Sequence, residues 1–151
     1  MIEQPLPNPH LAAWRAFLKA HAALVDQIDH DLVTAERLPL SSYDVLIELC
    51  EASGQRLRMH ELAERVLLSR SGLTRLVDRL ESEGYLTRDP CKTDRRGAYA
   101  VLTDRGYEAL QIAWPIYARG IARYFADWLT PDETVMLEAA FNRMLHGLSQ
   151  E

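Results

Sequence analysis

The sequence predicts a mainly α-helical α+β protein with six helices and a small antiparallel sheet. Apolar residues recur every three or four positions across most of the 151 residues, which is typical of helices with one buried face. Two short segments, residues 85–88 and 98–102, alternate between apolar and polar in the manner of strands. A length close to ~150 residues predicts one domain over residues 1–151.

The composition is that of an ordinary globular protein, with 48% hydrophobic and 26% charged residues. No apolar run reaches the ~18 residues that a membrane helix needs. Residues 1–10 lack the basic and apolar regions of a secretory signal, so none is expected. Two cysteines, Cys50 and Cys91, make no disulfide framework. A reducing cytoplasm is therefore the expected location.

The first part of the chain predicts three helices and an edge strand. A long amphipathic helix is expected over residues 10–36. Ser41 is expected to cap a second helix, which Gly54 ends. Residues 55–58 suit an edge strand, and residues 60–67 suit a third helix.

The fourth helix is the most clearly amphipathic one. Ser69 is expected to cap it, and Gly84 to end it. Its apolar residues stand at i, i+3, i+4 and i+7, namely Leu73, Leu76, Val77 and Leu80. Its opposite face is polar and carries Arg70, Ser71, Thr74, Arg75 and Asp78. This spacing predicts one buried stripe and one exposed face.

A hairpin and two more helices follow. The polar residues 89–97 are expected to join the two strands through a basic tip. A fifth helix is expected from Thr103 to about Trp128, kinked at Pro115. Its inward residues are predicted to be Leu110, Trp114, Tyr117, Ile121 and Phe125. Thr130-Pro131-Asp132-Glu133 has the cap, proline and acid of a helix start.

Two short helices followed by a basic hairpin predict a helix-turn-helix with a wing. In such a module the second helix enters the major groove of DNA, led by its N-terminal residues. Hydroxyls suit phosphates, and arginine suits the edge of guanine. The candidate DNA-binding residues are Ser69, Arg70, Ser71, Thr74, Arg75, Arg79, Lys92, Arg95 and Arg96. Asp94 is expected to pair with a neighbouring arginine and to stabilise the wing.

The charge distribution supports this interpretation. The whole chain carries −5, which by itself argues against a nucleic-acid binder. Residues 65–105, however, hold nine basic and six acidic residues, a charge of +3, and the rest carries −8. A confined basic stretch on an acidic chain predicts a localised contact with a polyanion.

These segments resemble the MarR family (multiple antibiotic resistance regulators). The resemblance rests on Leu62–Val66, Leu68–Leu80, Gly84-Tyr85-Leu86 and Asp94–Gly106, with weaker matches near Ser41 and Thr130. Two departures are Leu67, where many members have glycine in the turn, and Gly72 within the recognition helix. The resemblance implies a winged-helix homodimer. Residues 10–36 and 103–150 would supply dimerisation helices, and residues 40–102 the DNA-binding lobe with its wing at 86–102.

The resemblance also implies a function. Members bind a pseudo-palindromic operator, usually as repressors, and many release DNA when a small phenolic or other aromatic anion binds between the two lobes. Aromatic walls with a few polar groups suit such a ligand. The candidate effector pocket here consists of Trp14, Tyr43, Asp44 and Trp114. Ordinary core and dimer packing is the alternative explanation for these aromatic residues.

Three other functions were weighed against the ligand-responsive regulator. A redox-responsive regulator would act through Cys91, whose neighbours Lys92 and Arg95 would lower the thiol pKa. A protein-interaction module would keep the winged helix without binding DNA, but it would not need a basic wing. An enzyme lacks support, because the sequence has no phosphate loop, metal-ligand spacing or convergent nucleophile. No metal and no cofactor are therefore expected.

Overall fold

The computed structural model describes residues 8–66, 70–90 and 97–150, which form two compact units. One unit comprises residues 29–117, and the other combines residues up to Ile28 with those from Ala118 onward. The division falls within the first and fifth helices, so each of these helices contributes to both units. Helices and one small sheet account for both units, which confirms the predicted fold class.

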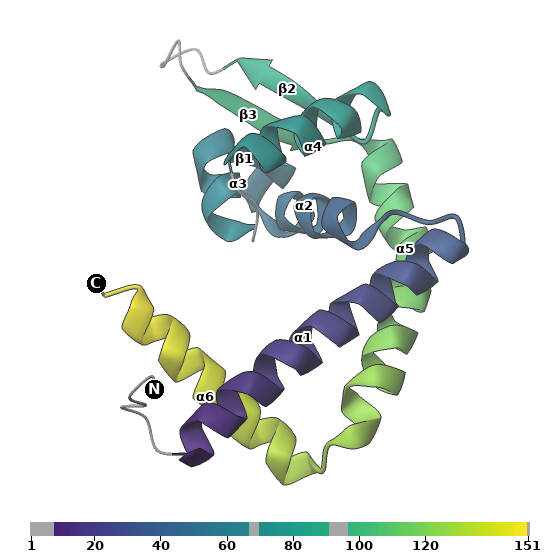
Figure 1. The fold of residues 1–151 in the computed structure, drawn as a ribbon. Coiled ribbons are helices and arrows are strands. Elements are labelled where there is room, and N and C mark those ends of the chain that lie inside the picture. Colours follow the sequence, from purple (N-terminus) through teal and green to yellow (C-terminus); the bar gives the residue numbers. More distant parts are fainter. Residues whose placement is uncertain (1–7, 67–69, 91–96, 151) are drawn as a thin grey trace. The chain divides into compact units, whose positions relative to one another are not determined.

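The unit of residues 29–117 contains the sheet and the short helices (Figure 1). Its elements are α2 (Leu40–Glu51), β1 (Arg56–Arg58), α3 (Met59–Arg65), α4 (Arg70–Ser82), β2 (Leu86–Pro90) and β3 (Ala98–Leu102). It also includes the end of α1 (Asn8–Thr34) and the beginning of α5 (Asp104–Tyr124). Strand β3 lies between β1 and β2 and runs antiparallel to both. The edge strand and the hairpin are thus confirmed.

The predicted buried stripe of α4 packs into the core of this unit. Leu73, Leu76, Val77 and Leu80 are all buried, as are leucines of α2, α3 and β2 in the same unit. Gly84 ends the helix with φ +82°, a conformation that glycine adopts without strain. The Tyr85 N–H donates to the Leu80 carbonyl at 2.9 Å and closes the last turn. Helix α4 is therefore fixed on its inner face and at its C-terminus.

The start of α2 differs from the prediction. Helix α2 begins at Leu40, so Ser41 lies within its first turn instead of capping it. The capping residue is Pro39, whose side chain makes no cap hydrogen bond. Instead, Asp29 of α1 accepts a hydrogen bond from the Leu40 N–H at 2.8 Å. A carboxylate from another helix thus satisfies a free N–H group at this N-terminus.

The junction between the sheet and α5 is tightly built. Thr103 precedes the helix, and its hydroxyl accepts from the Gly106 N–H at 3.1 Å and donates to the Gly84 carbonyl at 2.7 Å. The Thr103 N–H donates to the Tyr85 carbonyl at 3.2 Å. Gly106 lies so close to the Tyr85 carbonyl that a side chain there would overlap the oxygen. These contacts join the end of α4 to the start of α5.

Helix α5 is shorter than predicted, and two of its five predicted inward residues are exposed, whereas Leu110 is buried as predicted. It passes through Pro115 and ends at Tyr124, and a short turn (Ala126–Trp128) follows it. Trp114 and Phe125 were expected to point inward, but both are exposed. The buried positions of α5 are Gly106, Leu110, Ala113 and Gly120. Small residues on this face allow close packing, which apolar periodicity alone does not reveal.

The second unit contains the beginning of α1, the end of α5 and α6 (Pro131–Leu148). Helix α6 starts as predicted, with Thr130 capping the Glu133 N–H at 3.3 Å and Glu133 accepting from the Thr130 N–H at 2.8 Å. Phe17 of α1 packs on Phe141 of α6, with 5.5 Å between ring centroids. No helix in the described part of the chain combines the length and apolarity that crossing a membrane requires.

Candidate nucleic-acid interface and adjoining cavity

The outer face of α4 exposes the polar residues that the sequence placed there. Ser71, Thr74, Arg75, Asp78 and Arg79 are all exposed, opposite the buried stripe. Arg70 begins the helix, and Ser69 lies outside the described residues. One face of a single helix therefore carries hydroxyl and guanidinium groups together, as contact with a DNA groove requires.

The two arginines of this face differ in their surroundings. The guanidinium of Arg79 donates to the Ser42 hydroxyl of α2 at 3.5 Å. Arg75, by contrast, makes no ion pair or hydrogen bond through its side chain with any residue that the structure describes. Arg75 is therefore a cation of α4 that is available to an external anion.

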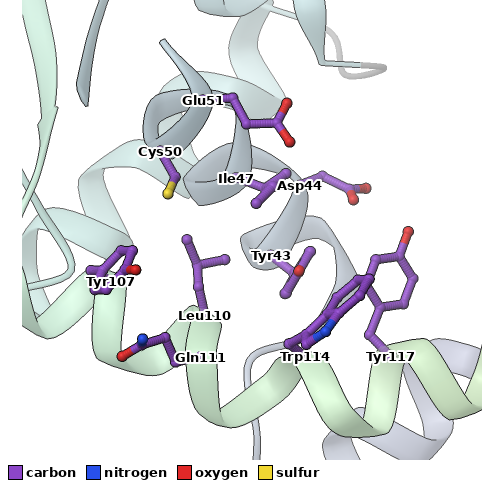
Figure 2. Close-up of a pocket in the computed structure, with 10 residues that line it drawn as sticks. All are labelled: Tyr43, Asp44, Ile47, Cys50, Glu51, Tyr107, Leu110, Gln111, Trp114 and Tyr117. Carbon is purple, nitrogen blue, oxygen red and sulfur yellow. The ribbon is translucent and has the colours of Figure 1, made fainter. Parts of the chain in front are cut away.

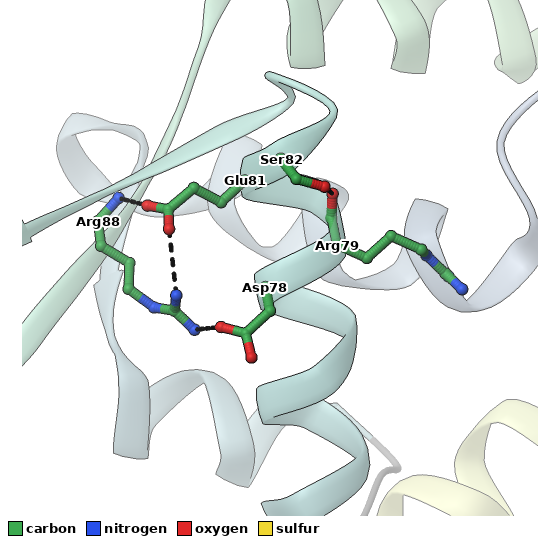
Figure 3. A network of polar contacts seen from close by, with 5 residues as sticks. All are labelled: Asp78, Arg79, Glu81, Ser82 and Arg88. Atoms are coloured by element: carbon green, nitrogen blue, oxygen red, sulfur yellow. Dashed lines mark hydrogen bonds and ion pairs between the residues drawn. The ribbon is translucent and has the colours of Figure 1, made fainter.

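A second group of charges links α4 to the sheet. Arg88 of β2 binds Asp78 at 2.6 Å and Glu81 at 3.2 Å through its guanidinium (Figure 3). The backbone N–H of Arg88 also donates to a carboxylate oxygen of Glu81 at 2.8 Å. We call these three residues the Arg88 cluster. The cluster ties β2 to α4, and its one guanidinium offsets part of the charge of two carboxylates on α4.

The tip of the wing lies outside the described residues. Lys92, Asp94, Arg95 and Arg96 all belong to this segment, as does Cys91. The strands that bear the tip remain paired as far as Pro90 and Ala98. The predicted DNA contacts of the wing, its pairing through Asp94 and the redox role of Cys91 therefore stay predictions.

Two basic residues of β1 were not predicted from the sequence. The guanidinium carbon of Arg56 lies 3.9 Å from the centre of the Tyr99 ring, and that of Arg58 lies 5.5 Å from it. Arg58 also donates to the Tyr99 hydroxyl at 3.3 Å, and Arg56 pairs with Asp89 at 3.9 Å. The alternation of Arg56, Leu57 and Arg58 on an edge strand was the available signal, because it places both arginines on one face.

A cavity of about 670 Å³ lies between α2 and α5 within the same unit (Figure 2). The residues lining it are Tyr43, Asp44, Ile47, Cys50, Glu51, Tyr107, Leu110, Gln111, Trp114 and Tyr117. Three of the four predicted pocket residues are among them. The fourth, Trp14, belongs to the other unit, where its ring centre lies 6.0 Å from that of Phe17. This volume suits a small organic ligand.

The aromatic side of the cavity is ordered by ring contacts. Tyr43 and Tyr117 meet edge to face with 4.7 Å between centroids, and Trp114 contacts Tyr117 at 6.1 Å. Burial raises the pKa of the Tyr43 and Tyr117 hydroxyls, and neighbouring negative charge raises both further. Partial desolvation, followed by the nearby Glu48, also raises the pKa of the Asp44 carboxyl. The walls thus disfavour negative charge.

The described residues contain no cluster of three or more histidine, cysteine or acidic side chains that could hold a metal ion. Cys50 is a half-buried free thiol in the wall of the cavity. The described residues therefore include an exposed polar face on α4 that carries arginines, and a separate cavity large enough for a small ligand.

Comparisons with known proteins agree with this architecture. A family model of the MarR family matches residues 38–97. YkoM of Bacillus subtilis (strain 168), an uncharacterized HTH-type transcriptional regulator, is 39% identical over 88 residues, which cover 58% of this chain and 56% of that protein. The match thus spans just over half of that relative.

Two solved structures from Streptomyces coelicolor match nearly the whole chain. The MarR family transcriptional regulator AbsC is 31% identical with a TM-score of 0.87, over 99% of this chain and 100% of AbsC. Sco3205, a MarR family regulator in complex with DNA, is 33% identical with a TM-score of 0.87, over 97% of this chain and 92% of Sco3205. The chain therefore belongs to the MarR family of winged helix-turn-helix, DNA-binding transcriptional regulators, and it is not an enzyme.

Proposed function

We propose that this protein is a cytoplasmic, homodimeric repressor that binds a pseudo-palindromic operator and is released by a small aromatic or phenolic effector. Helix α4 would enter the major groove, and the wing with Lys92, Arg95 and Arg96 would contact the adjacent backbone. The observation that carries this proposal is the exposed polar face of α4, where Arg75 has no anionic partner among the described residues.

The surroundings of that face support DNA binding. Asp78 and Glu81 would repel phosphate, but Arg88 pairs with both of them. Arg88 therefore offsets part of the negative charge that lies beside Arg75. The relative Sco3205, which was solved in complex with DNA, shares this fold at 33% identity.

Exposed apolar side chains support the dimer. In the unit formed by the chain ends, Trp128 is 80% exposed and Leu148 is 71% exposed. Apolar side chains also line a groove of about 530 Å³ on this unit. A monomer seldom leaves so much apolar surface in contact with water. Two copies of the chain would cover these surfaces and place two recognition helices on one operator.

The cavity between α2 and α5 supports the effector. It lies in the unit that carries the recognition helix, and α2 contacts that helix through the Arg79–Ser42 hydrogen bond. A ligand between α2 and α5 would thus act on an element that contacts α4. Release of the operator would follow if the ligand binds a conformation that does not fit DNA.

Operator binding by an Arg75→Ala variant tests the DNA-binding part. A duplex selected from the organism's own genomic fragments would be titrated by fluorescence anisotropy at fixed salt. We expect Arg75→Ala to weaken specific binding by about 1–3 kcal/mol. Arg119→Ala is the matched control, because it removes one exposed arginine from the other unit.

The outcome separates the proposed interface from a general charge effect. Equal losses in Arg75→Ala and Arg119→Ala would show that net charge alone governs binding. Wild-type affinity in Arg75→Ala would show that α4 does not contact the operator in the proposed way. A selective loss in Arg75→Ala, combined with reduced discrimination at one base pair, would support groove reading.

A further inference from the structure

Resting on the proposed effector function, we propose that the cavity between α2 and α5 binds an aromatic cation, an organic ammonium carrying an aromatic ring. The family resemblance led us to expect a phenolic or aromatic anion instead. The charged groups and aromatic rings of the cavity wall determine which ligand charge the cavity favours.

The wall of the cavity contains acids but no bases. Asp44 and Glu51 of α2 both line it, and none of its ten lining residues is a lysine, arginine or histidine. Figure 2 shows both carboxylates on the α2 side, with the aromatic rings from α5 below them. A ligand carboxylate in this cavity would meet like charges without a compensating cation.

Asp44 has no counter-charge within the described part of the chain. Its carboxylate makes no ion pair there, and the neighbouring Glu48 adds a second negative charge. Glu48 itself is compensated by Arg65 at 3.7 Å. The carboxylate of Asp44 is therefore available to a positive group that enters the cavity.

The aromatic side chains suit the same kind of ligand. Tyr117 contacts both Tyr43 and Trp114, so these three rings form one group next to Asp44. The faces of such rings attract cations, and a ring with a nearby carboxylate is the usual environment for an organic ammonium. Ile47 and Leu110 supply apolar contacts for the aromatic part of the ligand.

The pKa values of the residues in the cavity wall also bear on the charge of the ligand. The pKa values of Tyr43, Asp44 and Tyr117 are all raised, so each group is held towards its protonated form. The causes are desolvation and neighbouring negative charge. Desolvation would oppose a charged ligand of either sign, whereas the negative charge would oppose a ligand carboxylate and attract an ammonium group.

The test uses three ligands of similar shape and different charge: naphthylmethylammonium, naphthylmethanol and naphthoate. Each would be titrated into the full-length protein by calorimetry at neutral pH. We expect the ammonium to bind at least about tenfold more tightly than naphthoate, with the alcohol in between. Binding would be located by protection of Cys50 from iodoacetamide in a Cys91→Ser background, because Cys50 lines the cavity.

Variants of the cavity wall test whether the charge of Asp44 sets the preference for the ammonium. Asp44→Asn keeps the shape of the side chain and should remove most of the preference for the ammonium. Asp44→Lys should reverse the preference towards naphthoate. Glu108→Gln is the matched control, because Glu108 is exposed on α5 and does not line the cavity. This control should retain the wild-type order.

Each result counts for or against the inference. Tighter binding of naphthoate with protection of Cys50 would overturn the cationic specificity but leave the effector site standing. Ammonium binding that neither protects Cys50 nor responds to Asp44→Asn would place the ligand elsewhere and overturn the inference. Failure of all three ligands to bind would overturn both the inference and the effector role, whereas operator binding through Arg75 would be untouched.

Discussion

Gly106, at the start of α5, shows how one residue sets the distance between two segments. Its backbone lies against the Tyr85 carbonyl, and the Leu102 side chain lies 2.8 Å from where a Cβ atom would stand. Backbone atoms cannot move away as a flexible side chain can. The position therefore excludes every side chain, although the helix around it would accept alanine readily.

We predict that Gly106→Ala lowers the free energy of unfolding by about 1–3 kcal/mol, because the added methyl group overlaps the Tyr85 carbonyl. Chemical denaturation would measure the loss. Gly147→Ala is the matched control within α6, since nothing lies within 4 Å of its Cβ position. That change should be neutral or stabilising by up to about 1 kcal/mol. Equal stability of both variants would contradict the close approach at Gly106.

A second prediction at the scale of single residues concerns Asp44 and the way in which the stability of the folded protein depends on pH. Desolvation and Glu48 raise its pKa above 3.8 in the folded protein, so the folded state binds the proton more tightly than the unfolded state. Ionisation of Asp44 therefore costs stability as the pH rises above 3.8. Asp44→Asn removes this cost. We expect the variant to melt slightly above wild type at neutral pH, and the difference to vanish as the pH falls below that value.

Thermal unfolding at a series of pH values would measure this difference, which should be small because solvent screens the exposed carboxylate. Glu108→Gln, with its exposed carboxylate on α5, serves as the comparison. A stabilisation that is constant over the whole pH range would contradict an origin in the titration of Asp44.

The Arg88 cluster belongs to the scale of elements, because it fixes a strand to a helix. Arg88 of β2 binds Asp78 and Glu81 of α4, which lie one turn apart on the same helix face. The planar guanidinium can serve both carboxylates at once, which the single ammonium of lysine does less well. One side chain thus contributes ionic contacts to both acids and helps to orient the hairpin against α4.

We predict that Arg88→Met lowers stability by about 1 kcal/mol, as expected for a partly exposed pair of ionic contacts. Operator affinity should fall more than stability suggests, because Asp78 would then repel the phosphates. Anisotropy titration and denaturation would measure the two effects separately. Adding Asp78→Asn to Arg88→Met should recover part of the affinity, and an absence of recovery would mean that Arg88 acts only on the fold.

At the scale of the whole molecule, the proposed function requires two binding surfaces, one for a second copy of the chain and one for DNA. The unit of the chain ends exposes large apolar side chains, whereas the unit of the sheet carries the polar face of α4. The net charge of −5 hides this division, because the basic residues concentrate in residues 65–105. An acidic scaffold with a confined basic surface should reduce non-specific association with DNA.

The dimer leads to a prediction about assembly. Leu145→Asp should shift the protein towards a monomer, because it places a charge in the exposed apolar surface of α6, where Leu145 is 65% exposed. Light scattering after gel filtration would give the mass, and the wild type should have twice the mass of the 17.2 kDa chain. Asn142→Asp adds the same charge on α6 without removing an apolar group, and it should remain dimeric. A monomeric wild type would contradict the proposal.

The polyanion contact leads to a second prediction at this scale. Operator affinity should fall steeply as salt rises, because phosphate contacts release counterions. If Arg96 contacts phosphate, Arg96→Ala should weaken binding to all sequences alike and reduce the salt slope by about one per wing. Titrations at several salt concentrations would give the slope. An unchanged slope would show that Arg96 does not contact phosphate.

The sequence by itself determined those features that depend on neighbouring residues. The buried stripe of α4 follows from apolar spacing, and the end at Gly84 follows from the freedom of glycine to adopt positive φ. The capping box of Thr130 and Glu133 joins residues three apart. Such interactions are local, so the order of residue types is sufficient to predict them.

The tertiary structure decided what depends on residues distant in sequence. Asp29 caps a helix that begins eleven residues later, where Ser41 had seemed the natural cap. Arg88 finds its two acids on α4, and the cavity is assembled from α2 and from α5, which begins more than fifty residues after α2 ends. Only the fold sets these distances, because each side chain has several possible partners and packing selects among them. For the same reason, the sequence predicted an aromatic pocket, and the acidic sign of its wall emerged only from the assembled structure.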